Sequence, residues 1–500
     1  MLAAARARLF HATPRSRALP PAALRSWPIT SPSPAVAVSA ATPTTHAASV
    51  WARAMASSTF KYVILGGGNA AGYAAKAFAE GGAAPGSVCM VTREEVLPYE
   101  RPALSKAFLF GDPPARLPGF HTSVGGGGSR QDAAWYADKG IDVKLGSEVT
   151  GVDVAAKKLT TAAGDSITAT DALILATGCE AIALSRTPGS GLKGIHTLRE
   201  YADGLELYDA LKAAAGKKVI VVGGGYIGME VAAAANMMGC DVTMLFPEAN
   251  VMPRLFTPEI AAHYEAAYKA KGIKLLNDGR LCEAFLDDGN GAVKGVLFCK
   301  NHEKEEIEGQ LVVVGVGARP NTGLVKDQGV DSAEGGLKVD GAMATSVPGV
   351  YAVGDIAAFP LLLDGGALTR SEHVAHARSS AAQAALAALG KSPAPYDYTP
   401  YFYSRVFGLS WKFYGFNRGT SVTVGDFAPQ LATVWVDGGK AVGSFMESPT
   451  DEQTAAMQTI ARAQPAVDVA ALQKLVPGKD AAALISAVAD AVKKGAQANL

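Results

Sequence analysis

The 500-residue sequence lacks features that would point to a membrane protein or to a disulfide-linked or metal-binding one. No run of 18 or more apolar residues occurs, so we expect no membrane-spanning helix. Its five cysteines are scattered singly and form no CxxC pair, which indicates neither a disulfide framework nor a zinc site. We therefore expect no metal and a reducing compartment. The cysteines are Cys89, Cys179, Cys240, Cys282 and Cys299.

Acidic residues are missing from the N-terminal part of the chain, where the first one is Glu80. An acid-free composition rich in Arg, Ser and Ala is typical of an organellar transit peptide, and we assign residues 1–58 to a disordered one. The alternative is a disordered Ala/Pro tail without a targeting role. Six arginines precede Glu80: Arg6, Arg8, Arg15, Arg17, Arg25 and Arg53.

The chain without these six arginines has 40 basic and 46 acidic residues, a net charge of −6. This acidic balance argues against a nucleic acid partner. Composition does not separate the chloroplast from the mitochondrion. We expect a soluble protein of one of these organelles, with the chloroplast slightly favoured.

Two glycine-rich turns each follow an apolar strand and precede the start of a helix. A strand, a turn without side chains and a helix N-terminus together hold a pyrophosphate on backbone N–H groups. Two such units predict two dinucleotides, and therefore electron transfer between them. The first turn contains Gly66, Gly67, Gly68, Asn69 and Ala70, and the second contains Gly223, Gly224, Gly225, Tyr226, Ile227 and Gly228.

An acidic residue follows the second strand of each unit, where the ribose of a bound dinucleotide lies. Glu94 follows the strand at 87–92, and Glu248 follows the strand at 241–246. A carboxylate there repels a 2′-phosphate, so Glu248 favours NADH, whereas Arg254 leaves NADPH possible. The alternative for each carboxylate is an ordinary solvated strand end.

Alternating strands and helices from Phe60 to about residue 390 predict α/β units with parallel sheets. A flexible loop is expected at 125–129 and a helix around Trp135. Ser392–Pro395 marks a boundary. Beyond it, alternating apolar residues predict antiparallel strands, followed by Ala-rich helices. These strands are expected at 421–424, 431–436 and 441–445.

Two further strings, ALILATG at 172–178 and VYAVGD at 350–355, accompany the glycine turns. Together they resemble the two-dinucleotide flavoprotein oxidoreductases. That resemblance implies an α/β fold of the glutathione reductase type, with two Rossmann-like domains that bind FAD and NAD, plus a C-terminal α+β domain. The expected domains are FAD-binding at 59–181 and 313–395, NAD-binding at 182–312, and C-terminal at 396–500.

Disulfide reductases of this family carry a Cys-x4-Cys pair after the first turn. The stretch from Gly72 to Glu100 contains only Cys89, so we exclude dithiol chemistry. The resemblance then narrows to the monodehydroascorbate reductases, in particular the organellar plant and algal forms, over residues 60–475. The strings that carry it are GGGNAAGYAA from Gly66, PYERPALSKAFLF from Pro98, RLPGFHTSVGGGG from Arg116, GGGYIGMEVAAAA from Gly223, PRLFTPEIA from Pro253, EHVAHAR from Glu372 and PYFYSRVF from Pro400.

This resemblance implies transfer of electrons from NADH through FAD to the monodehydroascorbate radical in two one-electron steps, which regenerates ascorbate. It leaves the oligomeric state open between a monomer and a weak dimer. Two alternatives remain. One is an NADH-dependent electron transferase that acts on ferredoxin or a quinone. The other is an NADH-gated flavoprotein of apoptosis-factor type.

The resemblance also assigns site residues. Lys106 is expected near the flavin ring with Glu200 as its partner, and both are catalytic candidates. Arg378 and Arg405 match the substrate arginines, since guanidinium groups stay charged and attract an anionic radical. FAD contacts fall on Gly66 to Ala70, Glu94, Arg101, Lys106, Val149, Arg199, Asp355, Val374 and Tyr403. NAD contacts fall on Gly223 to Gly228, Glu248, Arg254, Gly317, Glu372 and His373.

Overall fold

The computed structural model describes residues 57–111, 114–117, 119–123, 130–425 and 430–498. Most of the expected transit segment and the loop expected at 125–129 lie outside these residues. No helix in the described part of the chain is long and apolar enough to cross a membrane.

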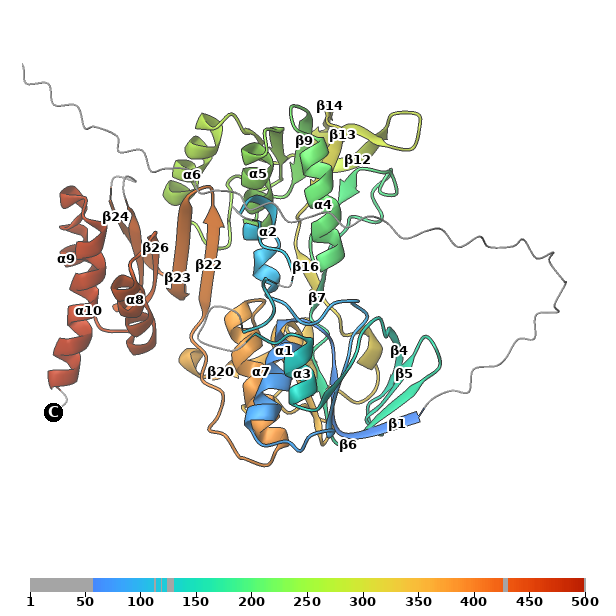
Figure 1. The fold of residues 1–500 in the computed structure, drawn as a ribbon. Helices are drawn as coiled ribbons and strands as arrows, with labels where there is room; N and C mark the ends of the chain where they lie inside the picture. The colour runs from blue at the N-terminus through green and yellow to red at the C-terminus, as the bar shows by residue number, and fades with distance from the viewer. Residues whose placement is uncertain (1–56, 112–113, 118, 124–129, 426–429, 499–500) are drawn as a thin grey trace, which may run out of the picture. The chain divides into compact units, whose positions relative to one another are not determined.

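The first glycine turn lies at the carboxyl end of a seven-stranded sheet. The residues that lead into the turn, Tyr62–Leu65, and the neighbouring Val88–Val91 are buried, which explains why these stretches are apolar. α1 (Asn69–Glu80) and α7 (Val374–Ala388) pack against each other beside it (Figure 1). In sheet order the strands are β3 (Ile141–Lys144), β2 (Val88–Val91), β1 (Ser57–Leu65), β6 (Ser166–Leu175), β5 (Lys158–Thr161) and β4 (Val149–Asp153), with β19 (Val350–Ala352) also paired to β6.

The second glycine turn follows the middle strand of a five-stranded parallel sheet. α5 packs on this sheet and begins at the turn itself. The strands in sheet order are β11 (Lys274–Leu276), β10 (Asp241–Leu245), β9 (Lys218–Val222), β15 (Leu311–Val314) and β8 (Ile195–His196). The helices of this region are α4 (Tyr201–Ala213), α5 (Tyr226–Met237) and α6 (Pro258–Ala270).

Smaller sheets and helices connect these two units. β7 (Cys179–Ala181) leaves the first unit and pairs antiparallel with β16 (Ala318–Pro320), which returns to it. The remaining strands are β12 (Leu281–Asp287), β13 (Val293–Lys300), β14 (Glu303–Glu308), β17 (Ser332–Ala333), β18 (Gly336–Lys338), β20 (Ala357–Leu361) and β21 (Ala367–Arg370). The short helices are α2 (Ala107–Phe110), α3 (Ala133–Asp138) and 3-10 turns at 101–103, 323–325, 354–356, 362–364 and 476–478.

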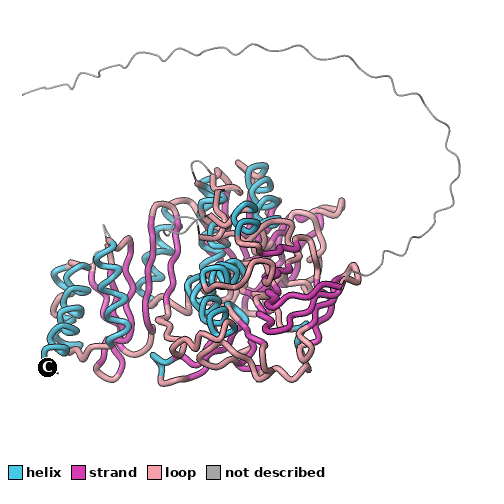
Figure 2. Tube along the Cα trace, turned by 60° about the horizontal axis from the view of Figure 1, so that its bottom comes forward, coloured by secondary structure: helices cyan, strands magenta, loops and turns pink. Residues whose placement is uncertain are grey.

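The C-terminal part is an antiparallel five-stranded sheet that is covered on both faces (Figures 1 and 2). Trp411 and Phe445 belong to a core shared with α5 and α6, while Val434 and Val436 pack under α8 and α10. In sheet order the strands are β22 (Tyr401–Val406), β23 (Leu409–Gly415), β26 (Lys440–Glu447), β25 (Ala432–Asp437) and β24 (Thr420–Val424), and the helices are α8 (Asp451–Ala463), α9 (Val469–Gln473) and α10 (Ala481–Ala498).

The expected fold class is confirmed, including the helix around Trp135 and the antiparallel strands after residue 396. The expected start of regular structure at Phe60 is wrong by three residues. β1 begins at Ser57, because Ser57 to Phe60 pair with Ser166 to Ala169 of β6. Ser57 and Ser58, assigned to the transit segment, therefore belong to a strand. The expected domain limits stay predictions.

Candidate dinucleotide and substrate sites

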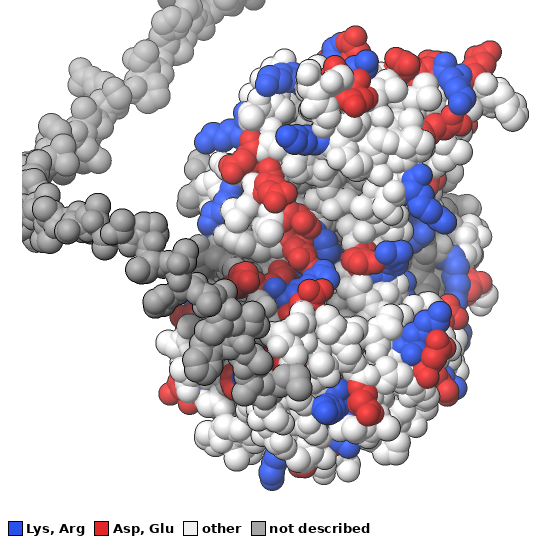
Figure 3. Space-filling model, turned by 90° about the vertical axis from the view of Figure 1, so that its right-hand side faces the viewer, with Lys and Arg blue, Asp and Glu red and all other residues white. Residues whose placement is uncertain are grey.

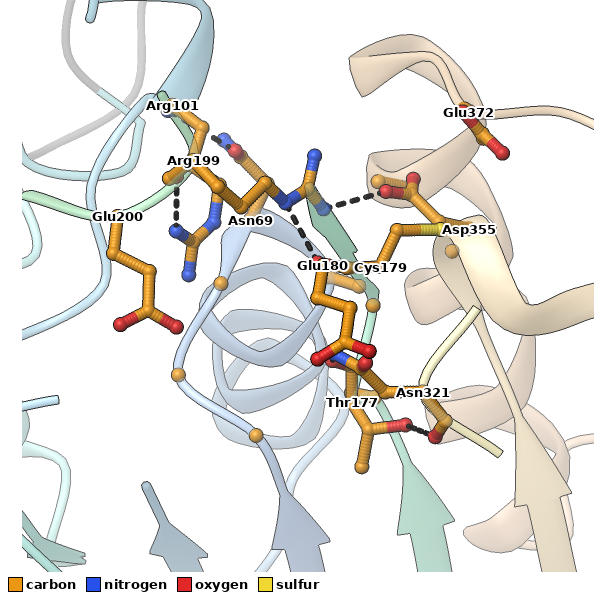
Figure 4. A pocket seen from close by; sticks show the side chains of 18 of the residues that line it. Asn69, Arg101, Thr177, Cys179, Glu180, Arg199, Glu200, Asn321, Asp355 and Glu372 are labelled. Atoms are coloured by element: carbon orange, nitrogen blue, oxygen red, sulfur yellow. Dashed lines mark hydrogen bonds and ion pairs between the residues drawn. The ribbon is translucent and has the colours of Figure 1, made fainter. Parts of the chain in front are cut away.

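A cavity of about 970 Å³ lies beside the first glycine turn (Figure 4). Its wall comes from the turn itself, the ends of β2 and β19, the 101–106 segment, the N-termini of α5 and α7, and β22. Every residue expected to contact FAD lies in this wall, from Gly66 in the turn to Tyr403 on β22. The structure therefore brings the predicted FAD residues together, and the FAD contacts themselves stay predictions.

The first turn fits a closely approaching ligand because its glycines are sterically required. Gly66 has φ +136°, and a Cβ there would overlap the carbonyl oxygen of Ala176. A Cβ at Gly67 would overlap Thr92, and one at Gly68 would lie 3.3 Å from Arg101 Nε. α1 begins directly after Gly68, which offers no side-chain cap to the helix N–H groups. Such a bare helix N-terminus attracts a pyrophosphate.

Glu94 and Arg101 form an ion pair in the cavity wall, with side chains only 9% and 17% exposed. The Tyr99 hydroxyl donates to Glu94 Oε2 at 2.9 Å, and Arg101 Nη1 donates to the Arg199 carbonyl at 2.8 Å. Two hydrogen bonds leave part of the four-site acceptor capacity of Glu94 open to ribose hydroxyls. The geometry suits the roles predicted for both residues.

Arg199 and Asp355 meet across the cavity, with Arg199 Nη2 2.7 Å from Asp355 Oδ2 (Figure 4). Arg199 Nε also donates to the Cys179 carbonyl at 2.8 Å. The Cys179 thiol lines the same cavity, but burial and the nearby Asp355 raise its pKa well above its ordinary value. Cys179 therefore stays a thiol, and all five cysteines are free. Both observations agree with the exclusion of dithiol chemistry.

The predicted pairing of Lys106 with Glu200 is wrong. Lys106 Nζ lies 2.9 Å from Glu230 Oε2 on α5, and Glu230 is fully buried. Glu200 instead pairs with the exposed Arg93 at the end of β2. The fold places an apolar helix against the 105–106 segment, so its single carboxylate becomes the counter-ion of the buried ammonium group.

Glu230 is the main site residue that sequence reasoning missed. Besides Lys106, it accepts hydrogen bonds from Ser105 Oγ and, at 2.6 Å, from Ser404 Oγ on β22. It thereby joins the 101–106 segment, the second unit and the C-terminal sheet. One signal was available: a lone carboxylate in the run Met229-Glu230-Val231, followed by four alanines, is costly to bury without a partner.

His373 and Tyr403 line the cavity as neutral donors. The His373 ring accepts the Ala375 N–H at Nδ1, and its Nε2 is buried without a partner among the described residues. Burial, aided by Arg378, lowers the pKa of His373 to about 3, so Nε2 carries the proton in the neutral form. Burial and the nearby Glu230 raise the pKa of Tyr403 to about 12. Lys106 Nζ lies 5.4 Å from the Tyr403 ring centroid.

The second glycine turn has the same backbone geometry but a more open surface. Gly223 has φ +125°, and a Cβ there would overlap the carbonyl oxygen of Gly315. Of the residues expected to contact NAD, Tyr226, Ile227, Glu372 and His373 line the cavity. Gly223, Gly224, Gly225, Gly228, Glu248, Arg254 and Gly317 lie outside its wall.

The side chains at the far end of this second turn are exposed. Glu248 and Arg254 are both exposed, and neither side chain has a hydrogen-bond or ion-pair partner among the described residues. Both are therefore free to contact a nucleotide ribose.

On the face drawn in Figure 3, acidic and basic side chains are interspersed. Within the described residues no group of three or more His, Cys, Asp or Glu side chains could hold a metal ion.

The two predicted substrate arginines lie outside the cavity wall. Arg378 Nη2 donates to Glu100 Oε2 at 2.7 Å, and its Cζ lies 5.1 Å from the Tyr73 ring centroid. Arg405 is exposed on β22, two residues after Tyr403. Both guanidinium groups act electrostatically on the Tyr403 hydroxyl. They therefore lie around one edge of the cavity, at Tyr403, and do not converge inside it.

Comparisons with known proteins agree with this geometry. Residues 60–384 match the family model for pyridine nucleotide-disulphide oxidoreductases, and residues 399–476 match that for the C-terminal domain of monodehydroascorbate reductase 3-like proteins. The solved putidaredoxin reductase–putidaredoxin complex is similar at a TM-score of 0.73 and 26% identity, covering 83% of this chain and 98% of that one.

Curated relatives are closer in sequence. Monodehydroascorbate reductase from Pisum sativum is 48% identical over 421 residues, covering 82% of this chain and 96% of the relative. The chloroplastic/mitochondrial monodehydroascorbate reductase of Arabidopsis thaliana is 45% identical and covers 82% of this chain and 84% of the relative. The chain belongs to the pyridine nucleotide-disulphide oxidoreductases and, within them, to the monodehydroascorbate reductase family.

Proposed function

We propose that the protein transfers electrons from NADH through bound FAD to the monodehydroascorbate radical in two one-electron steps and so regenerates ascorbate. The main observation in favour is that one cavity is lined by all residues expected to hold FAD. The same cavity is also lined by Tyr226 and Ile227, at the end of the second glycine turn. Two dinucleotides bound at the two turns would meet there. The relatives named for this activity support the same assignment.

The chain contributes binding, orientation and charge. FAD, when bound, supplies the conversion of a two-electron hydride donor into single-electron transfers. Glu230 fixes the Lys106 ammonium group at the cavity wall, where its N–H groups can donate to an electron-rich occupant. His373 supplies a neutral N–H donor. Arg378 and Arg405 attract the anionic radical to the edge of the cavity at Tyr403.

The direct test is steady-state turnover of the purified full-length chain, loaded with FAD, against radical generated by ascorbate oxidase. We expect turnover with NADH and a kcat/KM for NADH about tenfold above that for NADPH, because Glu248 is free to hold the ribose hydroxyls and repels a 2′-phosphate. Reduction of ferricyanide without any turnover of the radical would contradict the proposal and favour the ferredoxin- or quinone-type transferase, whereas slow turnover with every acceptor would favour the apoptosis-factor-like alternative.

Arg405→Ala separates a small radical acceptor from a ferredoxin- or quinone-type acceptor. We expect radical reduction to fall steeply while ferricyanide reduction survives, because ferricyanide does not need a guanidinium clamp. Equal losses in both assays would count against the substrate role of Arg405. Lys391→Ala, which removes an exposed cation elsewhere, serves as the control for net charge.

We further propose import into the chloroplast, directed by residues 1–56, and a monomeric or weakly dimeric state without a nucleic acid partner. Relatives with this organelle in their names include a rice protein 45% identical over 442 residues and the Arabidopsis thaliana chloroplastic/mitochondrial form. A fluorescent protein fused after residue 58 should accumulate in chloroplasts. Mitochondrial fluorescence alone would reverse the organelle, and light scattering on a size-exclusion column gives the mass.

A further inference from the structure

Glu100 connects the first glycine turn to a predicted substrate arginine. Its carboxylate accepts three hydrogen bonds: from Asn69 Nδ2 at 2.6 Å, from Tyr73 Oη at 3.0 Å and from Arg378 Nη2 at 2.7 Å. The Glu100 side chain is 14% exposed. Oε2 receives both the Asn69 and the Arg378 bonds, so a single oxygen ties the turn at Gly66–Ala70 to α7.

The Arg378 guanidinium is fixed from two sides but only partly used. Glu100 holds one Nη atom, and the Tyr73 ring lies 5.1 Å from Cζ. Nε is buried without a partner among the described residues, although the side chain as a whole is 42% exposed. A guanidinium has five N–H donors in a rigid fork. Arg378 therefore presents unused donors in a fixed orientation.

The reaction requires an arginine that releases anions as well as binding them. The radical anion gains one electron, supplied from NADH, and one proton from solvent, and it leaves as the ascorbate monoanion. Substrate and product thus carry the same charge, and an unopposed guanidinium would hold both. The Glu100 carboxylate, whose Oε2 lies 2.7 Å from Arg378 Nη2, offsets part of the guanidinium charge and fixes the orientation of the guanidinium group.

We propose that Glu100 is the positioning residue of Arg378, and that its charge sets how tightly Arg378 holds the anionic substrate and product. The inference rests on the proposed function, since it takes Arg378 to meet the ascorbate radical. A purely structural role, in which Glu100 only ties α1 to the 3-10 turn at 101–103, is the competing explanation.

The test compares Glu100→Gln with Glu100→Ala in the FAD-loaded full-length chain. Ascorbate is titrated at equilibrium against the absorbance of the oxidised flavin, and kcat and KM for the radical are measured separately. The Gln oxygen still accepts from Arg378 but carries no charge. We therefore expect Glu100→Gln to lower the Kd for ascorbate about fivefold and to keep kcat/KM within about twofold.

Glu100→Ala removes the acceptor as well as the charge. We expect its kcat/KM for the radical to fall about tenfold below that of Glu100→Gln, because the Arg378 guanidinium is no longer held in a fixed orientation. FAD content is measured for each variant, since Asn69 also loses its partner. Glu80→Gln makes the same charge change at an exposed position on α1 and is the control; its Kd should equal that of the native chain.

A double-mutant cycle shows whether the effect passes through Arg378. In an Arg378→Met background, Glu100→Gln should change the Kd by less than twofold. The proposal is overturned if the Gln and Ala variants behave alike, or if the fivefold change persists without Arg378. Absence of radical turnover and ascorbate binding in the native chain would contradict the proposed function itself, whereas native values in every Glu100 variant contradict only this inference.

Discussion

The two glycine turns share a backbone and differ in their surroundings. Gly66 and Gly223 both have positive φ. Each lies against a backbone carbonyl oxygen just after a neighbouring strand of its sheet: Ala176 after β6 for Gly66, and Gly315 after β15 for Gly223. At the first turn the strand-end carboxylate Glu94 is paired and only 9% exposed, whereas at the second turn Glu248 is exposed and unpartnered. The backbone thus provides pyrophosphate binding in both units. The side chains around it distinguish an enclosed site from an open one that suits an exchanging nucleotide.

Matched glycine substitutions should break the two sites differently and give the largest effect. Gly66→Ala places a Cβ on the Ala176 oxygen and should reduce FAD content more than about tenfold, since strain at such positions costs 1–3 kcal/mol before the clash is counted. Gly223→Ala should retain FAD and raise the KM for NADH by about tenfold or more. Absorbance at 450 nm and steady-state kinetics check both. Loss of FAD from both variants would refute the division into two sites.

The buried ion pair between the units should show the next largest effect. Glu230→Ala leaves Lys106 buried without its partner and should lower the free energy of unfolding by about 3–5 kcal/mol. Glu230→Gln keeps an acceptor oxygen for one of the two serines, Ser105 or Ser404, and an NH2 group that can donate to the other, so it should lose less. Urea unfolding of the FAD-loaded protein measures both variants. Equal losses would show that charge, and not hydrogen bonding, is what this position requires.

The pH dependence of stability should reveal the two histidines at the start of α7. Burial lowers the pKa of His373 to about 3 and that of His376 to about 4, below the unfolded value near 6.5. Between these values the unfolded chain binds protons that the folded chain does not, so stability falls as pH drops from about 6.5 toward 4. Each histidine contributes roughly 1 kcal/mol per pH unit.

His376→Gln tests this assignment by urea unfolding at several pH values. The variant should lose part of that pH dependence between pH 6 and 5. An unchanged slope would mean that His376 is protonated in the folded protein. His302→Gln, which changes an exposed histidine, is the control and should leave the slope unchanged.

Nucleotide preference sharpens the comparison between the two carboxylates. Glu248→Ala should narrow the preference for NADH over NADPH about tenfold, roughly 1.4 kcal/mol, because the exposed carboxylate no longer repels a 2′-phosphate. Glu94→Ala should leave that preference unchanged and lower FAD content instead. The ratio of the two kcat/KM values is the measurement. If Glu94→Ala changed the preference for NADH over NADPH, the assignment of NADH to the second glycine turn would be wrong.

The exposed pair should give the smallest effect. Arg93 and Glu200 join the same two units as Lys106 and Glu230, but their side chains are 54% and 29% exposed. Solvent screening limits such a pair to about 0.5 kcal/mol. Arg93→Ala should therefore shift urea unfolding only slightly, and added salt should remove the difference. A loss as large as that of Glu230→Ala would mean that exposure does not decide the strength of these pairs.

The parts of the fold and of the site that could be predicted are those encoded by local sequence patterns. The strand, turn and helix at Gly66 are encoded within about twenty neighbouring residues, so both nucleotide units could be recognised. The partner of Lys106 could not, because Glu200 and Glu230 both lie far from it in the sequence, and only the packing of α5 against the 105–106 segment decides between them. The start of β1 at Ser57 depends likewise on β6, more than a hundred residues away. The role of Glu100 emerges only when α1, α7 and the 99–101 segment are brought together.

The paired strands β7 and β16 have an evolutionary consequence. Cys179 lies opposite Pro320, and Ala181 lies opposite Ala318, so the chain leaves the first unit and re-enters it at adjacent points. Everything between these strands is therefore a cassette whose ends are only one strand spacing apart, about 5 Å. A different nucleotide-binding segment could therefore join the same two strands without stretching the backbone, provided that it also supplied a counter-ion for Lys106 and an apolar face for the C-terminal sheet.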